Sequence, residues 1–99
     1  MTVNIQYVGI DSSESLSQYT KEKLQKIEKK YEWLINCDVF FKTDNNQKEE
    51  GKICNMELSL PGPRIFATST EKNFEMAVKE TISDLERQLE KRKETFKTY

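Results

Sequence analysis

The chain has 99 residues, of which 35% are hydrophobic and 33% are charged. This length suits one domain around a single modest core, and we expect residues 1–99 to form that domain. No apolar run approaches the roughly 18 residues of a membrane span, and the first residues lack a secretory signal, so we expect a cytoplasmic protein without a membrane partner. The formal net charge of −1, taken alone, argues against a nucleic-acid partner.

The first part of the chain predicts a strand, a helix and a second strand. Residues 3–7 alternate apolar and polar side chains, which is typical of a strand with one buried face. Residues 14–31 carry apolar side chains at helical spacing and follow possible helix caps in residues 11–13. Residues 36–41 form the second strand, whose core-facing side chains are those of Cys37, Val39 and Phe41.

The remainder predicts two more strands and a long helix. Residues 44–51 are polar and lack periodicity, which indicates a loop. Residues 53–60 alternate again, and the Pro-Gly-Pro sequence of residues 61–63 predicts a turn before a short strand at 64–69. Residues 73–97 have helical spacing, with an apolar stripe of Phe74, Val78, Ile82, Leu85, Leu89 and Phe96.

The order of these elements is β-α-β-β-β-α, and each has one apolar face. We therefore expect an α+β two-layer sandwich, with two helices on one face of a four-stranded mixed sheet and the other face open. The first helix is a crossover, so the first two strands should be parallel and the later ones antiparallel. Cys37 and Cys54 should be reduced and buried, because neither has metal-ligand spacing.

The side chains that usually carry catalysis are scarce. The chain has no histidine, so neither cysteine has a partner of that kind to activate it. No glycine-rich loop has phosphate-binding spacing, and the carboxylates alternate with lysines as on solvated helix faces. We therefore expect no enzyme activity, metal, cofactor or small-molecule substrate.

Two clusters of basic residues each allow two interpretations. In the first helix, Lys23, Lys26 and Lys30 share one flank with Tyr19, which suits contact with phosphates and some stacking. The same lysines would be ordinary surface residues if they paired with neighbours such as Glu22. In the last helix, cations near the C-terminal end either complement the helix dipole or bind a polyanion; they are Arg87, Lys91, Arg92, Lys93 and Lys97.

Three segments resemble the short ribosome hibernation-promoting factors, also called the ribosome-associated inhibitor or sigma-54 modulation family. They occur in the family's order, and the match covers nearly all of residues 3–93. The segments are Leu16-x-x-Tyr19-x-x-x-Lys23-Leu24-x-Lys26-Ile27, then Leu58-Ser59-Leu60-Pro61-Gly62, and finally Leu85-x-Arg87-Gln88-Leu89-x-Lys91-x-Lys93. The family has the fold expected above.

The resemblance implies a single ribosome-binding domain that is monomeric when free. It implies binding to rRNA of the small ribosomal subunit, in the channel for mRNA and tRNA, which blocks translation and preserves idle ribosomes in starvation or stationary-phase stress. Long-form members add a dimerising domain, which we do not expect here. The family's basic positions match Lys23, Lys26, Arg87, Lys91 and Lys93, while Lys30 and Arg92 are candidates from helical periodicity alone.

The charge of the last helix qualifies this expectation. Asp84 and Glu90 stand among the basic residues of the last helix and dilute its positive charge. We expect Lys48, Lys72 and Lys79 to lie outside the RNA-binding surface. The alternative function is that of a protein-binding module that uses the open sheet face, where Phe40 and Phe66 would be exposed.

Overall fold

The computed structural model describes residues 1–44 and 51–96, with residue 96 described for its backbone only. The expected order of elements is confirmed. The elements are β1 (Thr2–Tyr7), α1 (Glu14–Lys30), β2 (Asn36–Asp44), β3 (Gly51–Ser59), β4 (Ile65–Glu71) and α2 (Phe74–Phe96).

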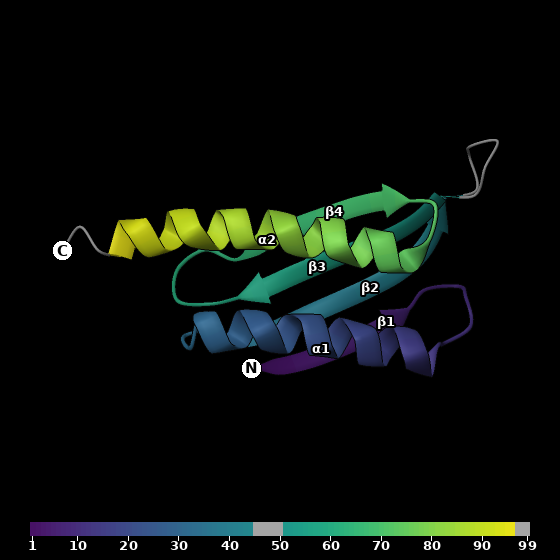
Figure 1. Ribbon diagram of the computed structural model, residues 1–99, viewed down its shortest axis with the longest axis horizontal. Coiled ribbons are helices and arrows are strands. Elements are labelled where there is room, and N and C mark those ends of the chain that lie inside the picture. Colours follow the sequence, from purple (N-terminus) through teal and green to yellow (C-terminus); the bar gives the residue numbers. More distant parts are fainter. Residues whose placement is uncertain (45–50, 97–99) are drawn as a thin grey trace.

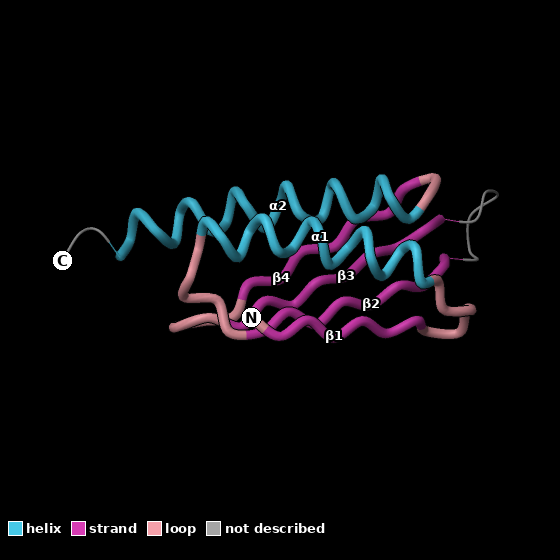
Figure 2. The backbone as a smooth tube through the Cα atoms, turned by 60° about the horizontal axis from the view of Figure 1, so that its bottom comes forward, coloured by secondary structure: helices cyan, strands magenta, loops and turns pink. Residues whose placement is uncertain are grey.

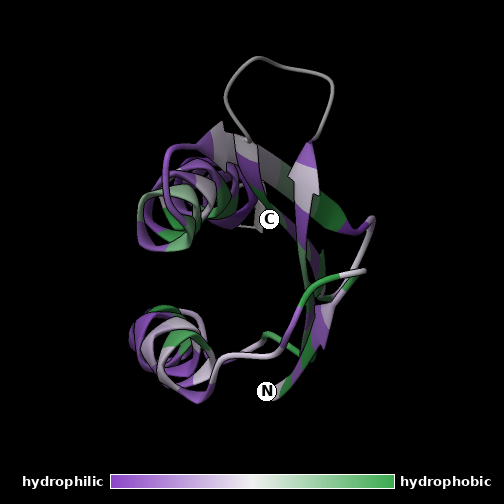
Figure 3. Ribbon diagram, turned by 90° about the vertical axis from the view of Figure 1, so that its right-hand side faces the viewer, coloured by the Kyte–Doolittle hydropathy of each residue, from purple (hydrophilic) through white to green (hydrophobic). Residues whose placement is uncertain are grey.

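The four strands form one mixed sheet in the order β1-β2-β3-β4. β1 pairs with β2 in parallel, and the pairs β2–β3 and β3–β4 are antiparallel, as predicted. Both helices lie side by side on the same face of this sheet (Figures 1, 2 and 3). The molecule is therefore the expected two-layer α+β sandwich, with α1 and α2 forming its helical layer.

The pairing of β2 with β3 extends further than the sequence predicts. Asp44 and Gly51, expected to be loop residues, are partners in the sheet. The ladder continues because main-chain hydrogen bonds form whether or not the side chains are apolar. Gly51 is needed for close packing, since a Cβ there would lie 2.7 Å from Thr70 Cγ2. The rest of the expected loop, 45–50, lies outside the described residues.

Polar side chains cap the N-terminal ends of both helices. Ser13 Oγ accepts a hydrogen bond from the backbone N–H of Leu16 at 3.2 Å, and Asn73 Oδ1 accepts one from Met76 at 2.8 Å. Each cap satisfies a backbone donor that has no partner within the helix. The caps explain why α1 and α2 begin at Glu14 and Phe74.

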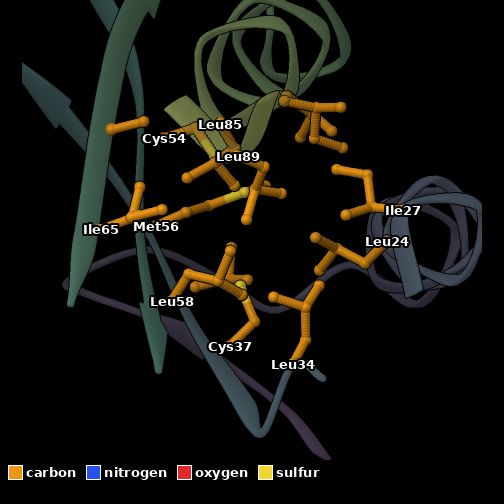
Figure 4. Packing of buried hydrophobic residues seen from close by; sticks show 14 of the residues in the cluster. Leu24, Ile27, Leu34, Cys37, Cys54, Met56, Leu58, Ile65, Leu85 and Leu89 are labelled. Carbon is orange, nitrogen blue, oxygen red and sulfur yellow. The ribbon is translucent and has the colours of Figure 1, made fainter. Parts of the chain in front are cut away.

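The core lies between the helices and the sheet, and Figure 4 shows side chains from both layers meeting there. Leu24 of α1 and Leu85 and Leu89 of α2 are fully buried against the sheet. Cys37 and Cys54 are both buried and free, as predicted. Burying each large side chain contributes about 1.5–3 kcal/mol, so the core holds both helices in a defined orientation.

Candidate nucleic-acid interface

The groove between the two helices gathers lysines from both. Lys23 and Lys26 of α1 and Lys79 of α2 line a hollow of about 250 Å³. Its other lining residues are Glu80, Ile82, Ser83 and Glu86. These residues come from both helices, which lie alongside each other in Figures 1 and 3. Three ammonium groups and two carboxylates meet at the hollow, and the ammonium groups can contact a ligand that carries phosphates.

Lys23 and Lys26 do not pair with the neighbouring carboxylate of Glu22. The carboxylate of Glu22 accepts a hydrogen bond from Gln18 Nε2 at 3.1 Å. Within residues 1–44 and 51–96 neither Lys23 nor Lys26 makes an ion pair. Lys23 Nζ lies 5.4 Å from the centroid of the Tyr19 ring, a cation–π distance that holds the ammonium group beside an aromatic face. These contacts favour the phosphate-binding interpretation.

A second hollow lies along the outer face of α2. It has a volume of about 600 Å³ and includes Arg87 and Lys91. Asp84 Oδ1 lies 3.7 Å from Arg87 Nη2, so one acidic residue of this helix partly neutralises one of its cations. The remaining lining residues are Ser83, Glu86, Gln88 and Glu90. Of the basic positions that match the family, two line the groove, two line this outer hollow, and Lys93 lines neither.

Lys30 has a partner within the protein. Its Nζ lies 3.8 Å from Glu86 Oε2, and both side chains are largely exposed. Such a pair is weak in water and can exchange its partner for a phosphate at small cost. Lys30 thus remains a candidate RNA contact at the rim of the groove.

The side chain of Arg92 binds the turn between β3 and β4. Its guanidinium group donates hydrogen bonds to the carbonyl oxygens of Pro61 at 3.1 Å and Pro63 at 2.8 Å. Gly62 lies between these carbonyls with φ +93°, and a Cβ there would come within 3.1 Å of Arg92 Nη1. The structure thus gives Arg92 a definite role in joining the end of α2 to the turn between β3 and β4.

Glu90 joins the two helices, and Lys93 follows it along α2. The hydroxyl of Tyr31, just past the end of α1, donates a hydrogen bond to Glu90. Burial raises the pKa of Tyr31 to about 12, and the hydrogen bond to Glu90 and the charges of Glu90 and Glu86 add to this effect. Lys93 is half-buried and lies seven residues after Glu86, which places it on the same side of the helix.

Lys79, which we expected to lie outside the RNA-binding surface, lines the groove with Lys23 and Lys26. The stripe of α2 defines two flanks but does not tell which flank faces α1. The spacing does place Lys79 on the same flank as Lys93, because Lys79, Glu86 and Lys93 follow one another at intervals of seven. Lys72 is exposed ahead of α2, and Lys48 lies outside the described residues.

No group of three or more His, Cys, Asp or Glu side chains within residues 1–44 and 51–96 is placed to hold a metal ion. In the same part of the chain, no helix is long and apolar enough to cross a membrane. The side chains that line the two hollows of the helical face offer positive and negative charge and hydrogen bonding, from lysine, arginine, glutamate, aspartate, glutamine and serine.

The open face of the sheet carries aromatic and polar side chains. Phe66 is 62% exposed, as expected, while Phe40 is half-buried. Both line a shallow pocket of about 380 Å³ with Asn55, Glu57 and Thr68. Arg64 pairs with Glu57 and Thr68 with Asn55, so polar groups of neighbouring strands satisfy one another there.

The geometry defines a two-layer α+β domain whose helical layer presents two hollows, each lined by cations and carboxylates. The chain belongs to the sigma 54 modulation protein / S30EA ribosomal protein family, whose model matches residues 3–97. This confirms the family resemblance read from the three sequence segments.

Individual relatives agree in sequence or in fold. The ribosome hibernation promoting factor of Pseudomonas putida is 28% identical over 94 residues, which cover 95% of this chain and 88% of the relative. A ribosomal subunit interface protein from Coxiella burnetii superposes with a TM-score of 0.83 at 28% identity, covering 94% of this chain and 98% of the other. The N-terminal domain of Thermus thermophilus Protein Y shares the fold, with a TM-score of 0.79, 13% identity and coverage of 92% and 98%.

Proposed function

We propose that this chain is a ribosome hibernation factor. It binds rRNA of the small ribosomal subunit in the channel for mRNA and tRNA, blocks translation and preserves idle ribosomes during starvation or stationary phase. It acts as a single cytoplasmic domain, monomeric when free, and its work is steric and electrostatic. The observation that carries the proposal is the groove in which Lys23, Lys26 and Lys79 converge, in a chain of this family.

The net charge of −1 does not oppose this function, because charge is distributed unevenly. Binding to RNA depends on the cations that meet phosphates, each of which releases condensed counterions. The groove supplies three such cations beside the carboxylates of Glu80 and Glu86. The outer hollow of α2 supplies Arg87 and Lys91 beside those of Asp84, Glu86 and Glu90.

A triple variant tests this site directly. Lys23→Gln, Lys26→Gln and Lys79→Gln remove the three groove cations, whose side chains contribute little to the core. In a plot of log affinity for purified small subunits against log salt concentration, each lost phosphate contact should reduce the slope by about 0.7–0.9, so about 2–3 in total. The same variant should relieve inhibition in a cell-free translation assay.

The matched control replaces Lys21, Lys29 and Lys72 with Gln. These exposed lysines do not line the groove, and the formal charge changes by the same amount. The control should retain both the affinity and the salt slope of the unmodified protein. Equal loss in both variants would mean that binding depends only on bulk charge, and retention in both would exclude the groove as the contact.

A protein-binding module is the second candidate function, and the exposed Phe66 with its pocket on the open sheet face favours it. This alternative would be supported if the triple variant still bound small subunits and the Phe66→Ser variant did not. Loss in the triple variant alone supports RNA binding by the helical face.

A further inference from the structure

Glu86 occupies an unusual place among the cations of the helical face. It lines both the groove between the helices and the outer hollow of α2, and it is one of two residues, with Ser83, that both hollows share. Glu86 also lies two helical turns after Lys79, on the same side of α2, at a rise of about 10 Å. Glu80 also lines the groove, and Asp84 and Glu90 line the outer hollow, but Glu86 is the carboxylate that both hollows share, between the cations of the groove and those of the outer hollow.

Folding does not explain this carboxylate. Its ion pair with Lys30 is 3.8 Å long, and the two side chains are 42% and 63% exposed. Exposed pairs of this kind contribute little to stability. A glutamine at this position would keep the helix propensity and the size of the side chain. The negative charge can therefore be removed without loss of the fold, and its removal alters the electrostatics of the two hollows.

The charge acts differently on two kinds of polyanion. A flexible strand that lies across both hollows brings a phosphate close to Glu86, and like charges about 4 Å apart in water weaken such binding about fivefold. A folded RNA presents phosphates from separate strands, so it can place them in the two hollows and leave the space at Glu86 free. Repulsion directed at the wrong partner is a general means of specificity.

We propose that Glu86 is a specificity-determining residue, which weakens binding to continuous phosphate strands and thereby favours a folded RNA whose phosphates occupy the two hollows separately. This inference rests on the proposed function, because it assumes that the helical face meets RNA. It assigns Glu86 a role that the basic residues cannot fulfil, since every cation strengthens binding to all polyanions alike.

The test compares Glu86→Gln with the unmodified protein on two probes, purified small ribosomal subunits and the single-stranded homopolymer poly(U). The variant should bind poly(U) about fivefold more tightly and with a steeper salt dependence. Its affinity for small subunits should rise less, so that the ratio of the two affinities falls. Thermal unfolding of the variant should match that of the unmodified protein, because the ion pair is exposed.

Glu32→Gln is the matched control, because Glu32 is exposed, lies beyond the end of α1 and lines neither hollow. If the control tightens poly(U) binding as much as Glu86→Gln, net charge alone is responsible and the inference is wrong. An unchanged affinity of Glu86→Gln for poly(U), or an equal gain on both probes, also overturns it. Failure of the unmodified protein to bind small subunits would instead refute the proposed function, and the poly(U) comparison still decides whether Glu86 repels phosphates.

Discussion

Replacing Arg92 should lower the stability of the protein and leave its contacts with phosphates nearly unchanged. The guanidinium group donates to the carbonyl oxygens of Pro61 and Pro63, so Arg92→Gln removes two charge-assisted hydrogen bonds. Such bonds contribute about 1.5–3 kcal/mol each when shielded from water. Both are exposed here, so we expect a total loss of about 1–2 kcal/mol. For a domain of this size, each kcal/mol corresponds to a fall of about 4–8 °C in Tm.

The neighbouring Lys91 provides a matched control with the same change of charge. Lys91 is exposed and lines the outer hollow of α2, so Lys91→Gln should change the free energy of unfolding by less than about 0.5 kcal/mol. It should instead reduce the salt slope of binding to small subunits by about 0.7–0.9, the effect of one phosphate contact. The two variants should thus separate, one in stability and the other in binding.

Thermal unfolding and salt-dependent binding of both variants check this reasoning, together with Arg92→Lys. The lysine keeps the positive charge but cannot bridge two carbonyl groups in the same way, so it should also lose stability. The reasoning is refuted if Arg92→Gln unfolds at the same temperature as the unmodified protein and reduces the salt slope as Lys91→Gln does. Arg92 would then be a phosphate contact, and the turn would not depend on it.

Two further predictions concern the core. Burial raises the pKa of Cys37 and of Cys54 from 9.0 to about 12. Between these pH values the thiols stay protonated in the folded protein and lose their protons when it unfolds. The free energy of unfolding should therefore fall as pH rises above about 9, by up to about 1.4 kcal/mol per pH unit for each thiol. Urea unfolding at several pH values measures this fall, and an equally steep fall after both cysteines are replaced with Ala would contradict it. Leu85→Ala should cost about 2–5 kcal/mol in urea unfolding, whereas Phe66→Ala, on the open face, should cost far less; equal costs would contradict the assigned layers.

The order of the elements and the core could be predicted from the sequence because both depend on local periodicity. Alternation identifies a strand face, as at Cys37 and Val39, and spacings of three and four identify a helix face, as at Leu85 and Leu89. Once each element has one apolar face, few ways remain to bury them all, and the two-layer sandwich is the economical one. The ends of β2 and β3 were less predictable, because polar residues such as Thr43 continue a ladder by their main chain alone.

The candidate site depended on the neighbours of each cation, which periodicity does not reveal. Helical periodicity made Arg92 a candidate RNA contact, whereas the folded chain brings the turn of residues 61–63 within hydrogen-bonding distance of its guanidinium group. Lys79 belongs to the groove because its flank of α2 happens to face α1. In the sequence, Glu90 lowers the positive charge of the last helix. In the structure, its carboxylate accepts a hydrogen bond from the hydroxyl of Tyr31, 59 residues away along the chain.

The sequence by itself thus determined which residues are buried, in what order the strands and helices occur, and that lysines accumulate on the exposed flanks of two helices. The tertiary structure decided which of those lysines meet, which have partners within the protein and where Glu86 interrupts them. The physical reason is the distance along the chain over which each property is specified. Burial of apolar side chains is specified by periodicity within each element, whereas the charge pattern of a surface depends on the rotation of one helix relative to another, which only the packing of the whole core defines.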